Sequence, residues 1–163
     1  MTTLAVTKGL AIATSLVAGG ANSVVSLIAV PALLSAPHTI AAKQFKLMHG
    51  IGSLIQPSST LLAALLHGFA AYRLHQSGSG AWSRWAAAAA LSSAILPLTI
   101  ALMEPTSRQL LAIAGTSEKR EGGTEISVKT EGLLRRWNVL NAVRGLLAVS
   151  AGAIGLWTVL DEY

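Results

Sequence analysis

Cysteine is missing from this chain of 163 residues, and charged and aromatic residues are scarce. Without cysteine, disulfide bonds, cysteine-ligated metals, haem-thiolate centres and iron–sulfur clusters are excluded. Charged residues make up 12% of the chain, whereas ordinary soluble domains carry about 25%. Aromatic residues make up only 5%. These shortages argue against a soluble core and indicate a small integral membrane protein.

Apolar residues take the place of the missing types, at 52% of the chain with a mean hydropathy of +0.57. They form four runs, at about residues 9–36, 50–72, 81–103 and 138–160. Each run has the length of about 20 residues or more that a helix needs to cross about 30 Å of hydrocarbon. The runs must be helical because lipid offers the backbone no hydrogen-bond partners. The sequence therefore predicts one transmembrane domain over residues 1–163, an all-α four-helix bundle.

The first run has a second interpretation as a cleaved signal peptide. It is too long for the apolar region of such a peptide, and it contains Asn22 and Pro31. A membrane span is the better interpretation.

The longest connection, residues 104–137, predicts a short extra helix. It opens with EPTSRQLLAIA, in which Pro105 and Thr106 suit the first turn of a helix. The charged stretch SEKREGGTE follows and predicts a solvated loop. A helix over about residues 127–137 then leads into the fourth run.

The net charge of +5 lies mostly outside the apolar runs, so it indicates topology and not a nucleic-acid interface. The two termini and the second connection share one side of the membrane and hold three basic residues, Lys8, Arg73 and Arg84. The first and third connections hold eight, which are Lys43, Lys46, Arg108, Lys119, Arg120, Lys129, Arg135 and Arg136. The positive-inside rule predicts that the first and third connections are cytosolic. We expect an endomembrane of the ER type, with lipid as a partner.

Polar residues fall on single faces of the predicted helices. Trp137, Asn141 and Arg144 follow the spacing i, i+4, i+7, and the first run carries a stripe that includes Asn22. Because successive spans run in opposite directions, one end of the bundle gathers most of these residues. They are His49, Gln56, Thr99, Glu104, Thr106, Trp137, Asn141 and Arg144. The pattern predicts a polar-mouthed pocket there, while small residues such as Gly145, Gly152 and Gly155 suit close packing at the other end.

Arg144 is the residue that needs most explanation, because a charge at membrane depth costs several kcal/mol unless it is paired or hydrated. One interpretation is a structural pair with Glu104 or with carbonyls at a helix end. The other is a cation that faces a ligand, favoured by Asn141 and Trp137 on the same helix face. The two interpretations are compatible.

The histidines of the second run predict no metal site. His49 and His67 are 18 residues apart, which is about five helical turns. One metal ion does not bridge that distance. A lone histidine in an apolar run is more often a hydrogen-bonded core residue.

Several motifs carry a resemblance that covers nearly the whole chain. They are WNVLNAVRGLL at residues 137–147, ILPLTIALMEPTSRQLL at 95–111, SLIAVPALLSAP at 26–37 and HGIGSLIQP at 49–57. In these motifs the chain resembles the anthrone oxygenase family, small four-span membrane proteins of fungal aromatic polyketide pathways. Two positions depart from the family pattern: Ser107 replaces an Asn after Pro-Thr, and His49 replaces an aromatic residue.

The resemblance implies oxidation of a polycyclic anthrone, of the emodin anthrone type, to its anthraquinone by O₂. It implies no metal, flavin or haem cofactor. The anthrone methylene loses a proton to give an extended enolate, which can itself pass an electron to O₂. The protein then needs a base, an anion stabiliser and a dry pocket. The expected partners are a small aromatic polyketide and O₂, and a homo-oligomer is left open.

We assign hypothetical roles on this basis. Arg144 and Asn141 stabilise the enolate oxygen, and either His49 or Glu104 takes the methylene proton. The predicted substrate-binding residues are Trp137, which stacks on the rings, Thr99 and Thr106, which orient phenolic hydroxyls, and Gln56. Two non-enzymatic alternatives stay open: a scaffold that tethers pathway enzymes through its third connection, and a small carrier of the aromatic product.

Overall fold

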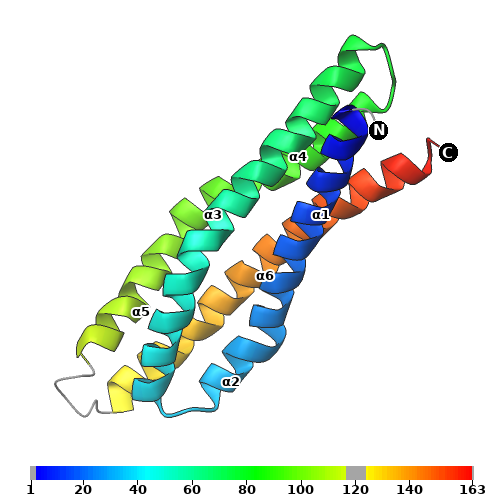
Figure 1. Cartoon of the computed structure of the whole chain (residues 1–163). Helices are drawn as coiled ribbons and strands as arrows, with labels where there is room; N and C mark the ends of the chain where they lie inside the picture. The colour runs from blue at the N-terminus through cyan, green and yellow to red at the C-terminus, as the bar shows by residue number, and fades with distance from the viewer. Residues whose placement is uncertain (1–2, 117–123, 163) are drawn as a thin grey trace.

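The computed structural model describes residues 3–116 and 124–162, in which four long helices form an antiparallel bundle (Figure 1). The first comprises α1 (Thr3–Val24), η1 (Val25–Ala29) and α2 (Val30–Leu34), and the second is α3 (His38–Gln76). The third comprises α4 (Trp82–Leu98), η2 (Thr99–Met103) and α5 (Glu104–Thr116), and the fourth is α6 (Thr124–Leu160). All four are long and apolar enough to cross a membrane. The predicted all-α, four-span architecture is confirmed, and the single domain over residues 1–163 stays a prediction.

The helices are longer than the apolar runs, which corrects the predicted connections. Residues 38–48 are the first turns of α3 and not a loop, because Pro37 ends the previous segment and its carbonyl accepts the N–H groups of Ile40 and Ala41 at 2.9 Å. The short helix predicted after residue 104 exists as α5, but it continues the third span without a break. The approach helix at 127–137 is likewise part of α6. Most of the predicted SEKREGGTE loop, residues 117–123, lies outside the described residues.

Two π-helical turns allow the first and third spans to continue past their prolines. Pro31 follows η1, and η2 lies between Pro97 and Pro105. A proline donates no backbone hydrogen bond, so the regular i→i+4 pairing cannot continue through it. The pairing shifts by one residue instead: the N–H of Val30 donates to Val25 O, and that of Glu104 to Thr99 O. The helical spans thus continue through wider turns beside these prolines.

Small residues bring α1 and α6 close together. A Cβ atom on Gly19 would lie 2.6 Å from Val149 Cγ2 and 2.9 Å from Val149 N, and one on Gly152 would lie 2.7 Å from Leu16 Cδ2. These distances are too short for real contacts, so the two backbones touch only because the residues are glycines. The predicted close packing of small residues is thus an interface between α1 and α6.

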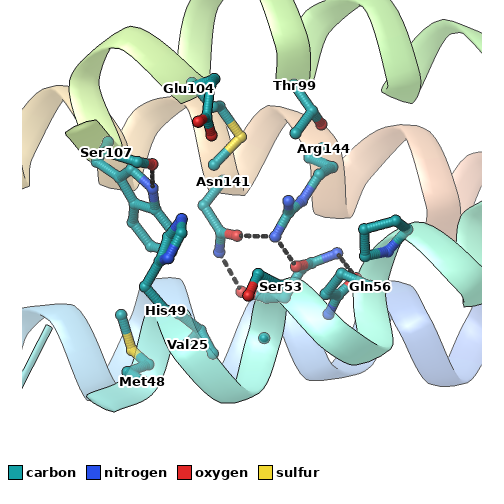
Figure 2. A pocket seen from close by; sticks show the side chains of 15 residues that line it. Val25, Met48, His49, Ser53, Gln56, Thr99, Glu104, Ser107, Asn141 and Arg144 are labelled. Atoms are coloured by element: carbon teal, nitrogen blue, oxygen red, sulfur yellow. Dashed lines mark hydrogen bonds between the residues drawn. The ribbon is translucent and has the colours of Figure 1, made fainter. Parts of the chain in front are cut away.

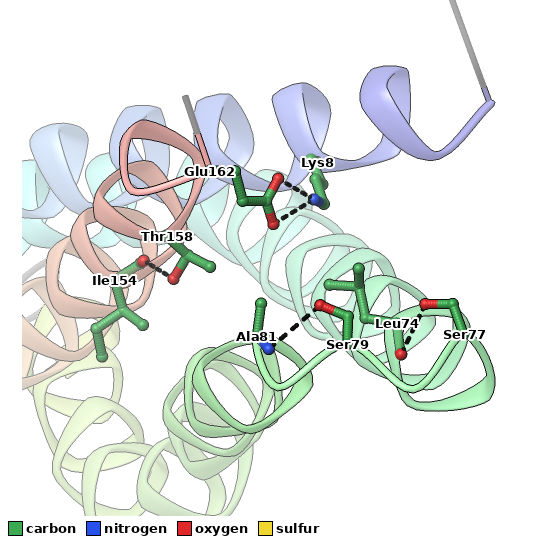
Figure 3. Close-up of polar contacts among 8 residues, drawn as sticks. All are labelled: Lys8, Leu74, Ser77, Ser79, Ala81, Ile154, Thr158 and Glu162. Atoms are coloured by element: carbon green, nitrogen blue, oxygen red, sulfur yellow. Dashed lines mark hydrogen bonds and ion pairs between the residues drawn. The ribbon is translucent and has the colours of Figure 1, made fainter.

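Ion pairs fasten the end of the bundle that holds both termini. Lys8 on α1 donates to both carboxylate oxygens of Glu162, at 2.7 and 2.6 Å (Figure 3). Arg84 on α4 pairs with Asp161 and lies over the ring of Trp157. The chain end after α6 is therefore tied to the first and third spans. The candidate active-site cavity lies toward the opposite end of the bundle.

Candidate active-site cavity

A cavity of about 180 Å³ lies inside the half of the bundle that contains the α2–α3 connection. All four spans contribute to its wall (Figure 2). The lining residues are Asn22, Val25, Met48, His49, Gly52, Ser53, Gln56, Pro57, Thr99, Met103, Glu104, Ser107, Trp137, Asn141 and Arg144. Seven of the eight residues predicted for the site are among them, and Thr106 is not.

The helix α3 forms the outer wall of this cavity. Both π-helical turns pack against α6 and make at most slight contact with α3. Gly52 and Pro57 of α3 line the cavity, and Ser53 and Pro57 are exposed on the outer surface as well as lining the cavity. A cavity of about 150 Å³ holds benzene. A three-ring ligand would therefore extend past Ser53 and Pro57 toward the surface.

Arg144 lies at the centre of a network of amide side chains. Its Nη2 donates to Asn22 Oδ1 at 2.9 Å and to Asn141 Oδ1 at 2.8 Å (Figure 2). Asn141 Nδ2 donates to the backbone carbonyl of Asn22 at 2.9 Å and to Ser26 Oγ at 2.7 Å. Asn22 Nδ2 lies 3.5 Å from Gln56 Oε1. The network joins the first, second and fourth spans at the cavity wall.

Arg144 does not make the ion pair that one interpretation of the sequence expected. Glu104 accepts a hydrogen bond from Arg108 Nε at 2.9 Å, one turn further along α5. Among the described residues, no carboxylate pairs with Arg144. Its partners are neutral amides, and its Nε is buried without a hydrogen bond. The guanidinium charge at the cavity wall is therefore not paired with any carboxylate of the described residues, although Glu104 also lines the cavity.

The two candidate bases, His49 and Glu104, project into the cavity from opposite walls (Figure 2). The His49 ring lies 5.6 Å from that of Phe45, centroid to centroid, and neither ring nitrogen has a hydrogen bond among the described residues. Glu104 is instead engaged by Arg108. The imidazole is thus the freer of the two proton acceptors.

The other predicted residues divide between wall and core. Thr99 and Gln56 line the cavity. Trp137 is also in the wall, but it is buried, with its indole N–H donating to Ser107 Oγ at 3.1 Å and its ring edge against Phe45. The indole is therefore held in place within the wall and not at an open mouth.

Thr106 lies away from the cavity, which corrects its predicted place in the site. Its side chain is buried, and its hydroxyl donates to Leu102 O at 3.3 Å within the helix. The next residue, Ser107, reaches the cavity instead. The α-helical continuation of η2 into α5 decides whether Thr106 or Ser107 faces the cavity. Residue spacing in the sequence does not reveal this choice across a π-helical turn.

His67 is a core histidine remote from the cavity. It is fully buried, its Nδ1 lies 2.8 Å from Ala63 O, and its ring packs near Trp85. This confirms the core interpretation of His67. No cluster of three metal-binding side chains occurs within the described ranges.

Asn22, Ser53 and Ser107 also line the cavity, although the sequence did not predict them as site residues. Asn22 was visible as a polar residue in the stripe of the first run, but its pairing with Arg144 joins positions 122 residues apart. Ser107 was noted only as a departure from a family pattern. Ser53 carries no signal, because an exposed serine on a helix is ordinary.

The fold and the site define a class: an integral membrane four-helix bundle that encloses a cavity with an unpaired cation in its wall. Comparisons with known proteins give the family. The family model described as Anthrone oxygenase matches residues 45–154 of this chain. An anthrone oxygenase of Claviceps purpurea is 32% identical over 148 residues, which are 89% of this chain and 83% of the relative. This chain belongs to the anthrone oxygenase family.

Other relatives carry related names. Monooxygenase hypC of Dothistroma septosporum is 31% identical over 140 residues, covering 84% of this chain and 74% of the relative. The noranthrone monooxygenase of Aspergillus flavus is 30% identical over 101 residues, covering 61% and 47%. No solved structure matches the chain.

Proposed function

We propose that this protein is a membrane-embedded oxygenase that converts a polycyclic anthrone to its anthraquinone with O₂, in a fungal type of aromatic polyketide pathway. Family membership supports the reaction class. One observation in the cavity supports it at the level of chemistry. Arg144 offers a cation without an ion-pair partner among the described residues, beside a space suited to ring compounds, and such a cation would stabilise an enolate intermediate.

The proposed reaction removes two hydrogens from the methylene carbon and adds one oxygen atom, and the second oxygen atom leaves as water. A base first takes one methylene proton to give the enolate. The enolate passes an electron to O₂, and the resulting radical pair combines at the same carbon to form a peroxide anion. The protonated base returns its proton to this anion, which gives a hydroperoxide. Loss of water then forms the second carbonyl. Because the substrate anion supplies the electrons, we propose that no cofactor takes part.

The role of anion stabiliser goes to Arg144 with Asn141, and we favour His49 over Glu104 as the base because its ring nitrogens are not engaged. Thr99 and Gln56 are placed to contact hydroxyl groups of the ligand. Trp137 offers a rigid aromatic wall, since Ser107 fixes its indole.

The location of the protein is part of the proposal. A flat, poorly soluble anthrone partitions into lipid, and the exposed lining residues Ser53 and Pro57 bring the cavity close to the outer surface of α3. We propose an endomembrane of the ER type, with the first and third connections in the cytosol and lipid as a partner. A homo-oligomer stays open.

The test is quinone formation by membranes that contain the protein, given emodin anthrone under air and then under argon. We expect acceleration over spontaneous oxidation only with both protein and O₂. Arg144→Ala should lower turnover by about 100-fold or more, as loss of an oxyanion donor does. A folded Arg144→Ala variant with full turnover would contradict the assignment. If quinone forms at the same rate with and without the protein, the scaffold or the carrier alternative would remain in place of the enzyme.

A further inference from the structure

Asn22 contacts the main polar residues of the cavity but lies outside the part of the chain that the family model matches, residues 45–154. It is buried on α1 and contacts Arg144, Asn141 and Gln56. We propose that Asn22 is a positioning residue for Arg144, and that its neutral amide keeps the guanidinium charge available to an anionic ligand. The inference rests on the proposed function, in which this ligand is the anthrone enolate.

The geometry explains how Asn22 orients the guanidinium. A guanidinium is planar and carries five N–H donors. Both N–H groups of Nη2 are used, one by Asn22 Oδ1 and one by Asn141 Oδ1. Two acceptors on one nitrogen, from two different spans, fix both the position and the plane of the group. Nε has no partner but is fully buried. Nη1 makes no hydrogen bond among the described residues, so it is the donor left for a ligand.

The backbone of Asn22 contributes as well. Its carbonyl oxygen accepts from Asn141 Nδ2 at 2.9 Å, and this bond orients the second amide that holds Arg144. One residue of α1 therefore fixes Arg144 directly through its side chain and indirectly through its main chain. Substitutions of the side chain alter the direct contact and the contact with Gln56, and they leave the backbone carbonyl in place.

The charge of the partner matters more than its hydrogen bond. An aspartate at position 22 would accept the same hydrogen bond and would pair with a buried cation, which is the usual arrangement inside membranes. Such a pair would also remove the net charge from the wall. Opposite charges about 4 Å apart attract strongly away from bulk water. The attraction that Arg144 would offer a ligand anion would then be satisfied by the protein.

The ligand that fits this arrangement is a planar organic anion whose charge is spread over an oxygen and its rings. The enolate of an anthrone belongs to this class. An anthraquinone carboxylate shares the flat rings and the negative charge, with the charge held on the carboxylate. Anthraquinone-2-carboxylate and its neutral primary amide are a matched pair of probes. They have the same rings and differ in charge.

The experiment compares wild type, Asn22→Asp and Asn22→Leu for thermal stability, turnover and binding of the two probes. Wild type should prefer the carboxylate over the amide. We expect Asn22→Asp to be at least as heat-stable as wild type, yet to lose about tenfold or more of that preference together with turnover. Asn22→Leu keeps the charge, so it should retain the preference while losing stability and turnover.

A purely structural role predicts a different pattern. Stability and turnover would then change together in both variants, and the preference for the carboxylate would not move. That pattern, or an Asn22→Asp variant with full preference and turnover, would overturn the proposal, and so would a wild type without preference. If wild type prefers the carboxylate but oxidises no anthrone, the proposed reaction fails while the binding comparison still decides the role of Asn22.

Discussion

His49 and Glu104 differ in how the protein holds them, although both reach the same cavity. Arg108 engages the Glu104 carboxylate at 2.9 Å from the next turn of α5. The His49 ring rests near Phe45 and has no hydrogen bond among the described residues. An uncommitted imidazole in a shielded cavity suits a general base better than a carboxylate that is already paired.

We predict that His49→Gln lowers anthrone turnover by about 100-fold or more, the usual contribution of a general base. Glu104→Gln should keep turnover within a few-fold of wild type. Initial rates of quinone formation, corrected for spontaneous oxidation, check both variants. A large loss in Glu104→Gln with little loss in His49→Gln would reverse the assignment.

At the scale of elements, the site depends on how closely α1 approaches α6. Asn22 lies on α1, and both Asn141 and Arg144 lie on α6. Gly19 is one turn before Asn22, and it lies against Val149 and the carbonyl of Gly145. A side chain at Gly19 would push the helices apart and lengthen the hydrogen bonds to Arg144.

We predict that Gly19→Ala lowers the free energy of unfolding by about 1–3 kcal/mol, the usual effect of overpacking, and lowers turnover as well. Gly20→Ala is the matched control, because a Cβ atom there meets nothing within 4 Å. It should be neutral or slightly stabilising, since alanine favours helix over glycine. Thermal unfolding in detergent together with turnover checks the pair. Equal stability of the two variants would show that the close α1–α6 contact does not contribute to the stability of the fold.

The π-helical turns show why element boundaries were harder to predict than element types. Prolines near residues 31, 97 and 105 suggested kinks or helix ends. In a membrane, however, ending a helix exposes backbone groups to lipid. A one-residue shift in hydrogen bonding is the smaller disturbance. The spans therefore continue, and the shift rotates the following residues, which is how Ser107 and not Thr106 comes to line the cavity.

At the scale of the whole molecule, the two ends of the bundle have different characters. The end with both termini is fastened by ion pairs, whereas the other end holds the cavity and most exposed basic residues. The orientation of this bundle in the membrane stays a prediction from the count of basic residues.

A pair of single cysteines can test the orientation because the chain has no cysteine of its own. Ser35 lies in the α2–α3 connection and Ser77 in the α3–α4 connection, and both are exposed. In sealed ER-type vesicles with the cytosolic face outward, an impermeant maleimide should label Ser35→Cys and leave Ser77→Cys unlabelled until detergent is added. The opposite labelling would show that the predicted orientation is inverted.

The sequence by itself determined that the chain crosses a membrane four times, because apolar length and lipid permit little else. It also determined one face of α6, since Trp137, Asn141 and Arg144 follow helical spacing and indeed line one cavity. Contacts within one helix follow from its period alone, so these residues were predictable.

Only the tertiary structure decided what Arg144 touches. The sequence allowed an ion pair with Glu104, but the bundle places Asn22, 122 positions away, against the guanidinium instead. That choice depends on the glycine contact between α1 and α6, which a local pattern does not specify. Distances between spans arise from packing in three dimensions, and for that reason the partner of the buried charge could not be predicted from the sequence.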